Sequence, residues 1–147
     1  MMPCTKANYA WRFIAQKLLD EGDFDPKEYL CTSLDTDTIF PEDYMEYCGL
    51  QFLQHKDRHG VIWQAPLFYN LHLDERPWFV RCTGILRTAF MSAFLIGANL
   101  NPMSIFTFSL DLLIRADFIN PQHTMDDVAH VLTCMKAQQK GVPVIEV

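Results

Sequence analysis

Two histidines stand four residues apart in the segment HKDRH, residues 55–59. On a helix, residues at this spacing lie on one face, so His55 and His59 are placed to share a zinc ion, with His72 as a nearby third ligand. The glutamate that serves as general base in the HExxH motif is replaced by Lys56, and a cation beside the site opposes metal binding. A zinc-binding protein or enzyme built on these histidines is therefore the alternative, and we expect no cofactor.

A helix end explains the same residues without metal. Acidic residues follow Pro41, and the basic residues of HKDRH precede Gly60. Acids stabilise the N-terminus of a helix, bases stabilise its C-terminus, and glycine commonly follows its last turn. The pattern predicts one helix over about 41–60. A small β-hairpin near 50–65 is the alternative, because the sequence VIW after Gly60 favours extended backbone.

A second constellation consists of Asp126, His130 and Cys134, which are spaced four and four. A carboxylate, an imidazole and a thiol are the residue types of a nucleophilic triad. Stacked along one helix, however, they leave no opposing wall for an oxyanion hole or a substrate. The sequence also contains no phosphate-binding glycine motif and no GxSxG. We therefore predict that the protein is not an enzyme.

The charges of the chain are distributed unevenly. The formal net charge is -6, yet residues 20–46 contain ten acidic residues and one base, a net -9 that leaves +3 for the remainder. This asymmetry disfavours a nucleic-acid-binding face in the segment and suits a basic protein partner. Aromatic residues are interleaved with the acids, and tyrosine is a frequent interface anchor. The residues predicted to bind the partner are Asp35, Asp37, Glu42, Asp43, Tyr44, Glu46 and Tyr47.

Residues that typically begin or end helices recur along the chain. Apolar periodicity predicts a first helix over 6–21, which Gly22 closes. Asp25 is placed as the N-cap of a short second helix, and a last helix is expected over 124–140 before Gly141. The C-terminal VPVIEV is predicted to be a flexible or docked tail, with an edge strand as the alternative.

The strongest apolar periodicity lies over about 77–96 and 102–116. Both stretches leave only a narrow polar strip, so they predict two helices that form the central hairpin of the core. Asp111 and Arg115 are placed to pair along the second strip. The expected fold is all-α, a compact bundle of five or six helices in one domain over residues 1–147.

Composition limits the location of the protein. Residues 88–110 carry no formal charge, but the middle of this stretch reads GANLNP, which is too polar for a membrane-spanning helix. The five cysteines are odd in number and form no CxxC motif, which is typical of reduced thiols. The first twenty residues lack the apolar run of a signal peptide. We expect a cytoplasmic protein without membrane contact.

Size and charge together predict a non-enzymatic modulator or inhibitor that binds another protein. Its acidic and aromatic surface over residues 20–47 would occlude a basic partner, such as one that handles nucleic acid, without itself binding nucleic acid. Immunity proteins and phage anti-defence proteins act in this way. The alternatives are the zinc protein described above and a homo-oligomeric scaffold subunit that buries its apolar helical hairpin between chains.

Overall fold

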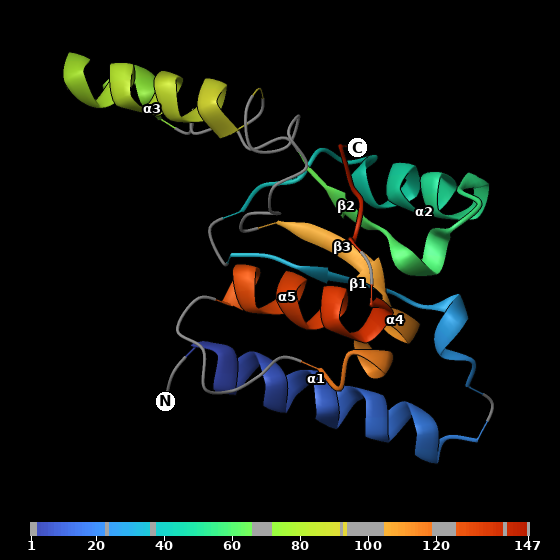
Figure 1. Cartoon of the computed structure of the whole chain (residues 1–147). Coiled ribbons are helices and arrows are strands. Elements are labelled where there is room, and N and C mark those ends of the chain that lie inside the picture. Colours follow the sequence, from blue (N-terminus) through green and yellow to red (C-terminus); the bar gives the residue numbers. More distant parts are fainter. Residues whose placement is uncertain are drawn as a thin grey trace.

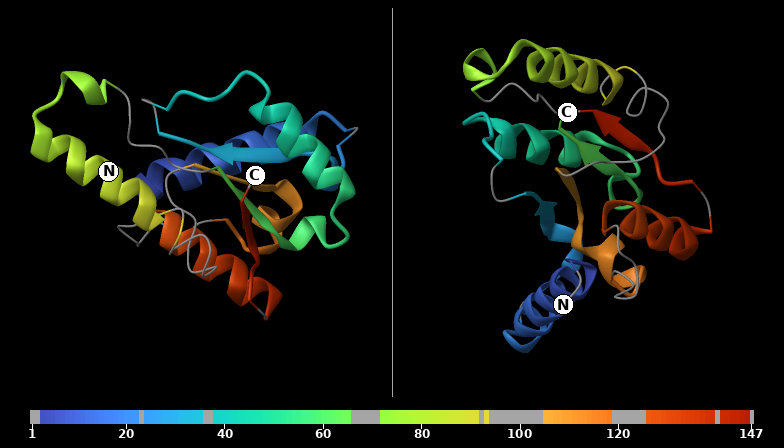
Figure 2. Two further views of the ribbon diagram at one scale, coloured as in Figure 1. Left: turned by 90° about the horizontal axis from the view of Figure 1, so that it is seen from above. Right: turned by 90° about the vertical axis from the view of Figure 1, so that its left-hand side faces the viewer.

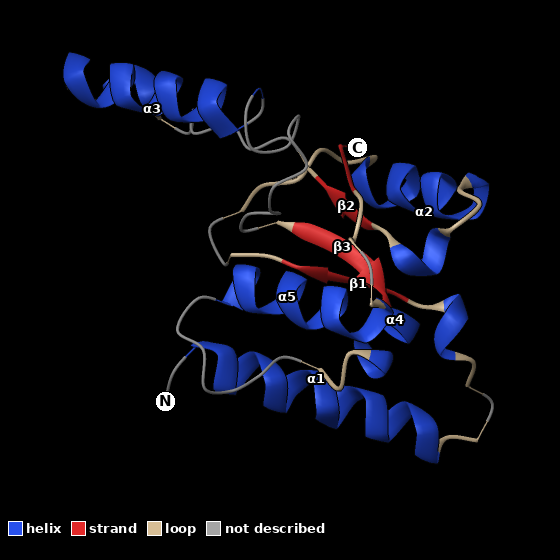
Figure 3. Ribbon diagram, in the orientation of Figure 1, coloured by secondary structure: helices blue, strands red, loops and turns tan. Residues whose placement is uncertain are grey.

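The computed structural model describes residues 3–22, 24–35, 38–65, 72–91, 93, 105–118, 126–139 and 141–146. Within these residues, four strands form one mixed sheet that has helices on both faces (Figures 1 and 3). The all-α prediction is therefore wrong. The strands are β1 (Leu30–Ser33), β2 (Ile62–Gln64), β3 (Phe106–Ser109) and β4 (Val144–Glu146).

The helices lie between and around these strands. The α-helices are α1 (Pro3–Asp20), α2 (Tyr44–Gln54), α3 (Trp78–Phe90), α4 (Leu110–Arg115) and α5 (Asp126–Gln138). The short 3-10 helices are η1 (Pro26–Glu28), η2 (Arg58–Gly60) and η3 (Leu73–Glu75).

β3 holds the sheet together. The strand order is β1-β3-β2-β4, and β3 pairs antiparallel with both β1 and β2. Phe108 lies opposite Cys31 on one side and opposite Ile62 on the other. The C-terminal β4 adds to the edge of the sheet, parallel to β2. The predicted tail is therefore an edge strand.

The predicted helix over 102–116 is, in its described part, a strand followed by a short helix. In FTFSL the residue types alternate with period two, so Phe106 and Phe108 lie on one face of β3 while Thr107 lies on the other. All four residues of β3 are buried because helices cover both faces of the sheet. The predicted pairing within α4 is confirmed, because Arg115 Nε lies 2.8 Å from Asp111 Oδ2.

α1 and α5 cover one face of the sheet (Figure 1). Trp11 packs edge-on against Phe108, with ring centroids 5.8 Å apart, and Ala15 of α1 joins the same core cluster. The predicted close of the first helix is confirmed, since Gly22 has a positive φ of 83° after the last turn. Asp25 accepts a hydrogen bond from the Lys27 amide, as expected of an N-cap.

α2 covers the opposite face of the sheet. It buries the row Tyr44, Cys48 and Phe52, and the Phe52 ring lies 5.5 Å from Trp63 of β2. The prediction that this helix continues to residue 60 is wrong, because α2 ends at Gln54 and His55 has extended backbone. The predicted hairpin near 50–65 is also absent, since β2 pairs with β3 and β4.

The last large element, α3, lies at one end of the molecule, beyond the sheet and its covering helices (Figures 1 and 2). The prediction of a helix beginning near residue 77 is confirmed. The prediction that it forms a central hairpin is wrong, because no residue of α3 is buried. We use the name layered body for the sheet together with its four associated helices, α1, α2, α4 and α5.

Candidate functional site

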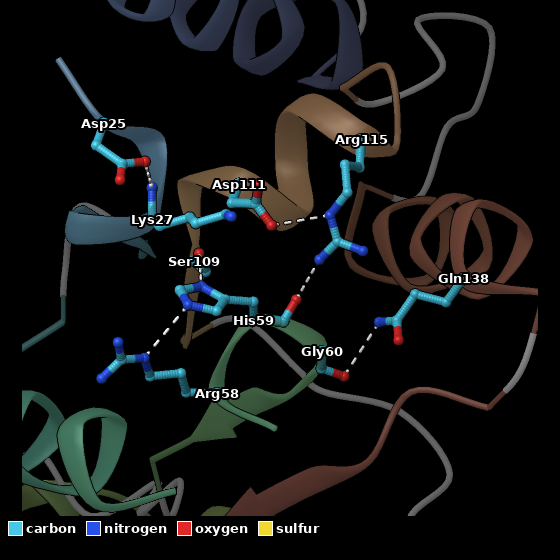
Figure 4. A network of polar contacts seen from close by, with 9 residues as sticks. All are labelled: Asp25, Lys27, Arg58, His59, Gly60, Ser109, Asp111, Arg115 and Gln138. Carbon is cyan, nitrogen blue, oxygen red and sulfur yellow. Dashed lines mark hydrogen bonds and ion pairs between the residues drawn. The ribbon is translucent and has the colours of Figure 1, made fainter. Parts of the chain in front are cut away.

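A polar pocket of about 580 Å³ opens beside the HKDRH segment. η1, η2, α4 and α5 meet around it, and Figure 4 shows the side chains that join them. These elements come from four separate parts of the sequence, so no single motif predicts the pocket. The residues that line it are Lys27, Asp57, His59, Gly60, Asp111, Arg115, Ala137 and Gln138.

Arg115 and Gln138 fasten η2 to the helices behind it. Arg115 donates to Asp111 Oδ2 at 2.8 Å and to the backbone carbonyl of His59 at 2.5 Å. Gln138 Nε2 donates to the carbonyl of Gly60 at 3.1 Å. Both carbonyls of the turn are thereby satisfied by side chains from α4 and α5 (Figure 4). The polar groups of the pocket mainly join the chain to itself.

Gly60 is closely packed against two side chains, and its backbone conformation does not demand glycine. A Cβ atom at this position would lie 3.0 Å from Gln138 Oε1 and 3.1 Å from Asp57 Oδ1. Those contacts are tighter than ordinary van der Waals separations, so the ends of the Gln138 and Asp57 side chains would have to shift by a few tenths of an ångström to admit a Cβ atom. Gly60 was predicted to follow the end of a helix. It lies instead where Gln138 of α5 packs against η2.

Both ring nitrogens of His59 are hydrogen-bonded. Its Nε2 accepts from Arg58 Nε at 3.3 Å, so the proton lies on Nδ1, which donates to Ser109 Oγ at 3.1 Å. Burial lowers the pKa of His59, and the positive charges of Arg58, Lys27 and Arg115 act in the same direction against Asp111. The imidazole is therefore neutral near pH 7.

The His59–Ser109 contact does not form a catalytic dyad. A general base must accept the serine proton, but the nitrogen facing Ser109 already carries a proton. Ser109 is also fully buried, so no substrate reaches its hydroxyl. The sequence did not indicate this contact, because residues 106–109 were predicted to be helical. A strand assignment would have placed Ser109 on the same face as Thr107.

The three histidines of the zinc alternative make separate contacts. His55 Nδ1 accepts from the Asp57 amide at 3.2 Å, and its ring packs edge-on against Trp63. His72 is exposed and lies 3.6 Å from Glu75 Oε1. Because α2 ends at Gln54, His55 and His59 do not share a helix face. Among the described residues, no three His, Cys, Asp or Glu side chains are grouped to hold a metal ion.

The row of Asp126, His130 and Cys134 lies on α5 as predicted, and its last two members belong to the core. His130 is fully buried, with its ring 4.4 Å from that of Phe108 and its Nε2 3.6 Å from Cys134 Sγ. Burial lowers the pKa of His130 to about 4 and raises the pKa of Cys134 to about 12. A neutral imidazole beside a neutral thiol cannot act as an activated nucleophile.

The predicted partner-binding residues have different environments. Glu42, Asp43, Glu46 and Asp35 are exposed, and Tyr47 is 48 % exposed. Asp37 lies outside the described residues. Tyr44, in contrast, is 6 % exposed and points into the body, where its hydroxyl lies 3.2 Å from Thr107 Oγ1. Of the two predicted tyrosine anchors, only Tyr47 is on the surface.

The acidic segment is divided between two places. Asp20, Glu21, Asp25 and Glu28 lie at the end of α1 and around η1, whereas Glu42, Asp43 and Glu46 lie at the start of α2. Figure 1 shows α1 and α2 on opposite sides of the sheet. The predicted single surface over 20–47 is therefore two surfaces. Among the residues expected to bind the partner, Glu42, Asp43, Glu46 and Tyr47 are exposed on the second.

The outer face of α2 carries apolar side chains beside these acids. Leu50 is 48 % exposed and Leu53 is 66 % exposed. Together with Glu46 they lie opposite the buried row of the helix, and Tyr47 lies on its flank. We call Glu42, Asp43, Glu46, Tyr47, Leu50 and Leu53 the α2 surface.

No protein-family model, curated protein or solved structure matches the chain. In the part of the chain that the structure describes, no helix has the length and apolar character needed to cross a bilayer. The α2 surface and the polar pocket are thus the sites from which function must be inferred.

Proposed function

We propose that the protein is a non-enzymatic binding module that recognises a basic protein partner through the α2 surface. The observation that carries this proposal is the exposure of Tyr47, Leu50 and Leu53 next to carboxylates, on a helix whose other face is fixed in the core. Apolar and aromatic side chains supply affinity once they are desolvated, and charges around them supply partner choice and a fast association rate.

The proposed action is occlusion. The α2 surface covers a cationic patch on its partner, such as one used to handle nucleic acid, and blocks it sterically and electrostatically. The polar pocket does not support an enzymatic alternative, because His59 is neutral and both of its ring nitrogens are hydrogen-bonded. This role is typical of immunity proteins and of inhibitors made by phages.

The acidic part of the α2 surface is tested by removing its charge. The variant Glu42→Gln, Asp43→Asn and Glu46→Gln leaves side-chain size almost unchanged. The tagged protein is used to capture its partner from the native host, and the purified pair is then measured by surface plasmon resonance at several salt concentrations. We expect the association rate to fall by about tenfold at low salt and to lose most of its salt dependence.

A matched control removes the same charge elsewhere. The variant Asp20→Asn, Glu21→Gln and Glu28→Gln changes exposed acids at the end of α1 and on η1, outside the α2 surface. This control should associate with the partner at nearly the unmodified rate. If both variants weaken binding equally, or if neither does, the α2 surface is not the recognition site.

A further inference from the structure

α3 presents its apolar side chains to solvent. At about 100° per residue, Trp78, Phe79, Cys82, Ile85 and Leu86 fall on one continuous face of the helix. Trp78 and Leu86 are each 69 % exposed, and Ile85 is 59 % exposed. We call these five residues the α3 face.

The opposite side of α3 is the side that the protein partly covers. Val80, Gly84 and Thr88 lie there, and they are the residues of the helix with intermediate exposure. A surface helix of a globular protein normally directs its apolar stripe inward, so this orientation is reversed. The α3 face therefore needs a contact that the layered body does not supply.

Charge indicates the nature of that contact. Arg81 and Arg87 lie at the two borders of the α3 face, and Arg76 precedes the helix. α3 itself contains no aspartate or glutamate, although Asp74 and Glu75 of η3 lie directly before Arg76. An apolar face with Trp and Phe, bordered by exposed arginines, is typical of a helix that lies in the surface of a bilayer.

We propose that α3 is an interfacial helix that binds the surface of an anionic lipid bilayer. Its apolar face enters the boundary between headgroups and acyl chains, and its arginines contact anionic headgroups. The position of α3 at one end of the molecule allows this contact without displacing the sheet or its covering helices (Figures 1 and 2). The helix lies along the bilayer and does not cross it.

This inference revises the sequence-based expectation of no membrane contact. That expectation rested on the polar middle of residues 88–110, GANLNP, which argues against a helix that crosses the bilayer but not against one that lies along it. The inference does not depend on the proposed function of the α2 surface, because the two helices expose different residues of opposite charge.

The test uses the full chain and vesicles of two compositions. Sedimentation with vesicles of phosphatidylcholine and phosphatidylserine should retain at least about tenfold more protein than vesicles of phosphatidylcholine alone, and the excess should fall as salt is added. Trp78 is a built-in probe, since its emission should shift to the blue when the indole leaves water. Trp63 is buried, and Trp11 packs against Phe108 on the body, so these two contribute a constant background.

Matched leucines provide the control. Leu86 on α3 and Leu53 on α2 are exposed to almost the same extent, 69 % and 66 %. Leu86→Asp should reduce vesicle binding by about tenfold or more, because a charge cannot enter the acyl boundary without cost. Leu53→Asp should leave vesicle binding unchanged. Circular dichroism of each variant establishes that it is folded.

Three outcomes would overturn the proposal. The first is equal sedimentation of Leu86→Asp and the unmodified protein. The second is equal binding to the two vesicle compositions. The third is a dimer, seen by light scattering over a dilution series, that Leu86→Asp abolishes in a protein that binds no vesicles; this would assign the α3 face to a second copy of the chain. None of these outcomes bears on the α2 surface, which Leu53→Asp tests against the protein partner.

Discussion

α2 and α3 both expose leucine and aromatic side chains, but they differ in how much of their other face is buried in the core. α2 buries Tyr44, Cys48 and Phe52 against the sheet, so its outer face is held in place by the core. α3 buries no residue and directs its apolar face away from the body. The comparison teaches that apolar exposure alone does not define a site. On α2 the exposed residues form a preformed surface, whereas on α3 they are the main apolar surface the helix has.

The largest expected effect is on the buried row of α2. Phe52→Ala should lower the free energy of unfolding by about 3–5 kcal/mol, because Phe52 is 5 % exposed and contacts the rings of Trp63 and His59. Urea denaturation followed by circular dichroism measures the change. Leu53→Ala, one position along the same helix but exposed, should cost far less. Similar losses for the two variants would mean that α2 is not anchored as described.

Acid should weaken the layered body through His130. Its folded-state pKa of about 4 lies below the ordinary value of 6.5, so the unfolded chain binds more protons between these values and stability falls as pH drops through that range. At about 1.4 kcal/mol per pKa unit, the loss by pH 4 is about 3 kcal/mol.

His130→Phe isolates this contribution from the titration of carboxylates. The variant keeps a ring against Phe106 and Phe108 but removes the titrating group. Its stability curve should be flatter than that of the unmodified protein between pH 6.5 and pH 4, whatever its stability at neutral pH. Parallel curves would place the imidazole in contact with water. α3 contains no His, Asp or Glu, so this pH dependence belongs to the body.

A smaller effect is expected at the hydroxyl of Tyr44. Tyr44→Phe removes its hydrogen bond to Thr107 Oγ1 and should cost about 0.5–1.5 kcal/mol, because Thr107 keeps its contact with Thr32 at 2.9 Å. Tyr47→Phe is the matched control on the exposed side of the same helix and should be nearly neutral. An equal cost for both would show that Tyr44 is not the buried member of the pair.

The smallest effect is expected on α3. Leu86→Ala should change the free energy of unfolding by less than about 0.5 kcal/mol, because Leu86 is 69 % exposed. The same denaturation experiment measures it beside Phe52→Ala. A loss of several kcal/mol would contradict the difference drawn between α2 and α3, since it would mean that α3 packs into the core in solution.

Local signals in the sequence predicted much of the helical structure. Gly22 and Asp25 close and open helices as expected, and α3 and α5 begin close to the predicted positions. These features depend on caps and turns a few residues long, which the sequence displays directly. The sheet could not be predicted in this way, because its strands have only three or four residues and pair across distant segments.

The candidate sites were predictable only in part. The acidic and aromatic character of residues 35–47 is a property of composition, whereas the burial of Tyr44 depends on Thr107, which lies far away in the sequence. The neutrality of His59 depends on its contact with Ser109, on its partial burial and on the positive charges of Arg58, Lys27 and Arg115, of which the last two come from distant parts of the sequence. The inverted orientation of α3 was not predictable, because apolar periodicity indicates a face but not what covers it.

The central position of β3 also constrains how the chain folds. Leu30 pairs with Ser109 and Ile62 pairs with Phe108. Neither β1 nor β2 can therefore pair with β3 until residues 106–109, far away in the sequence, are brought to them. Closing loops of this length costs chain entropy before any ladder hydrogen bond is gained. The helices should therefore form early and the sheet late. The rate-limiting step of folding should be the insertion of residues 106–109 between β1 and β2.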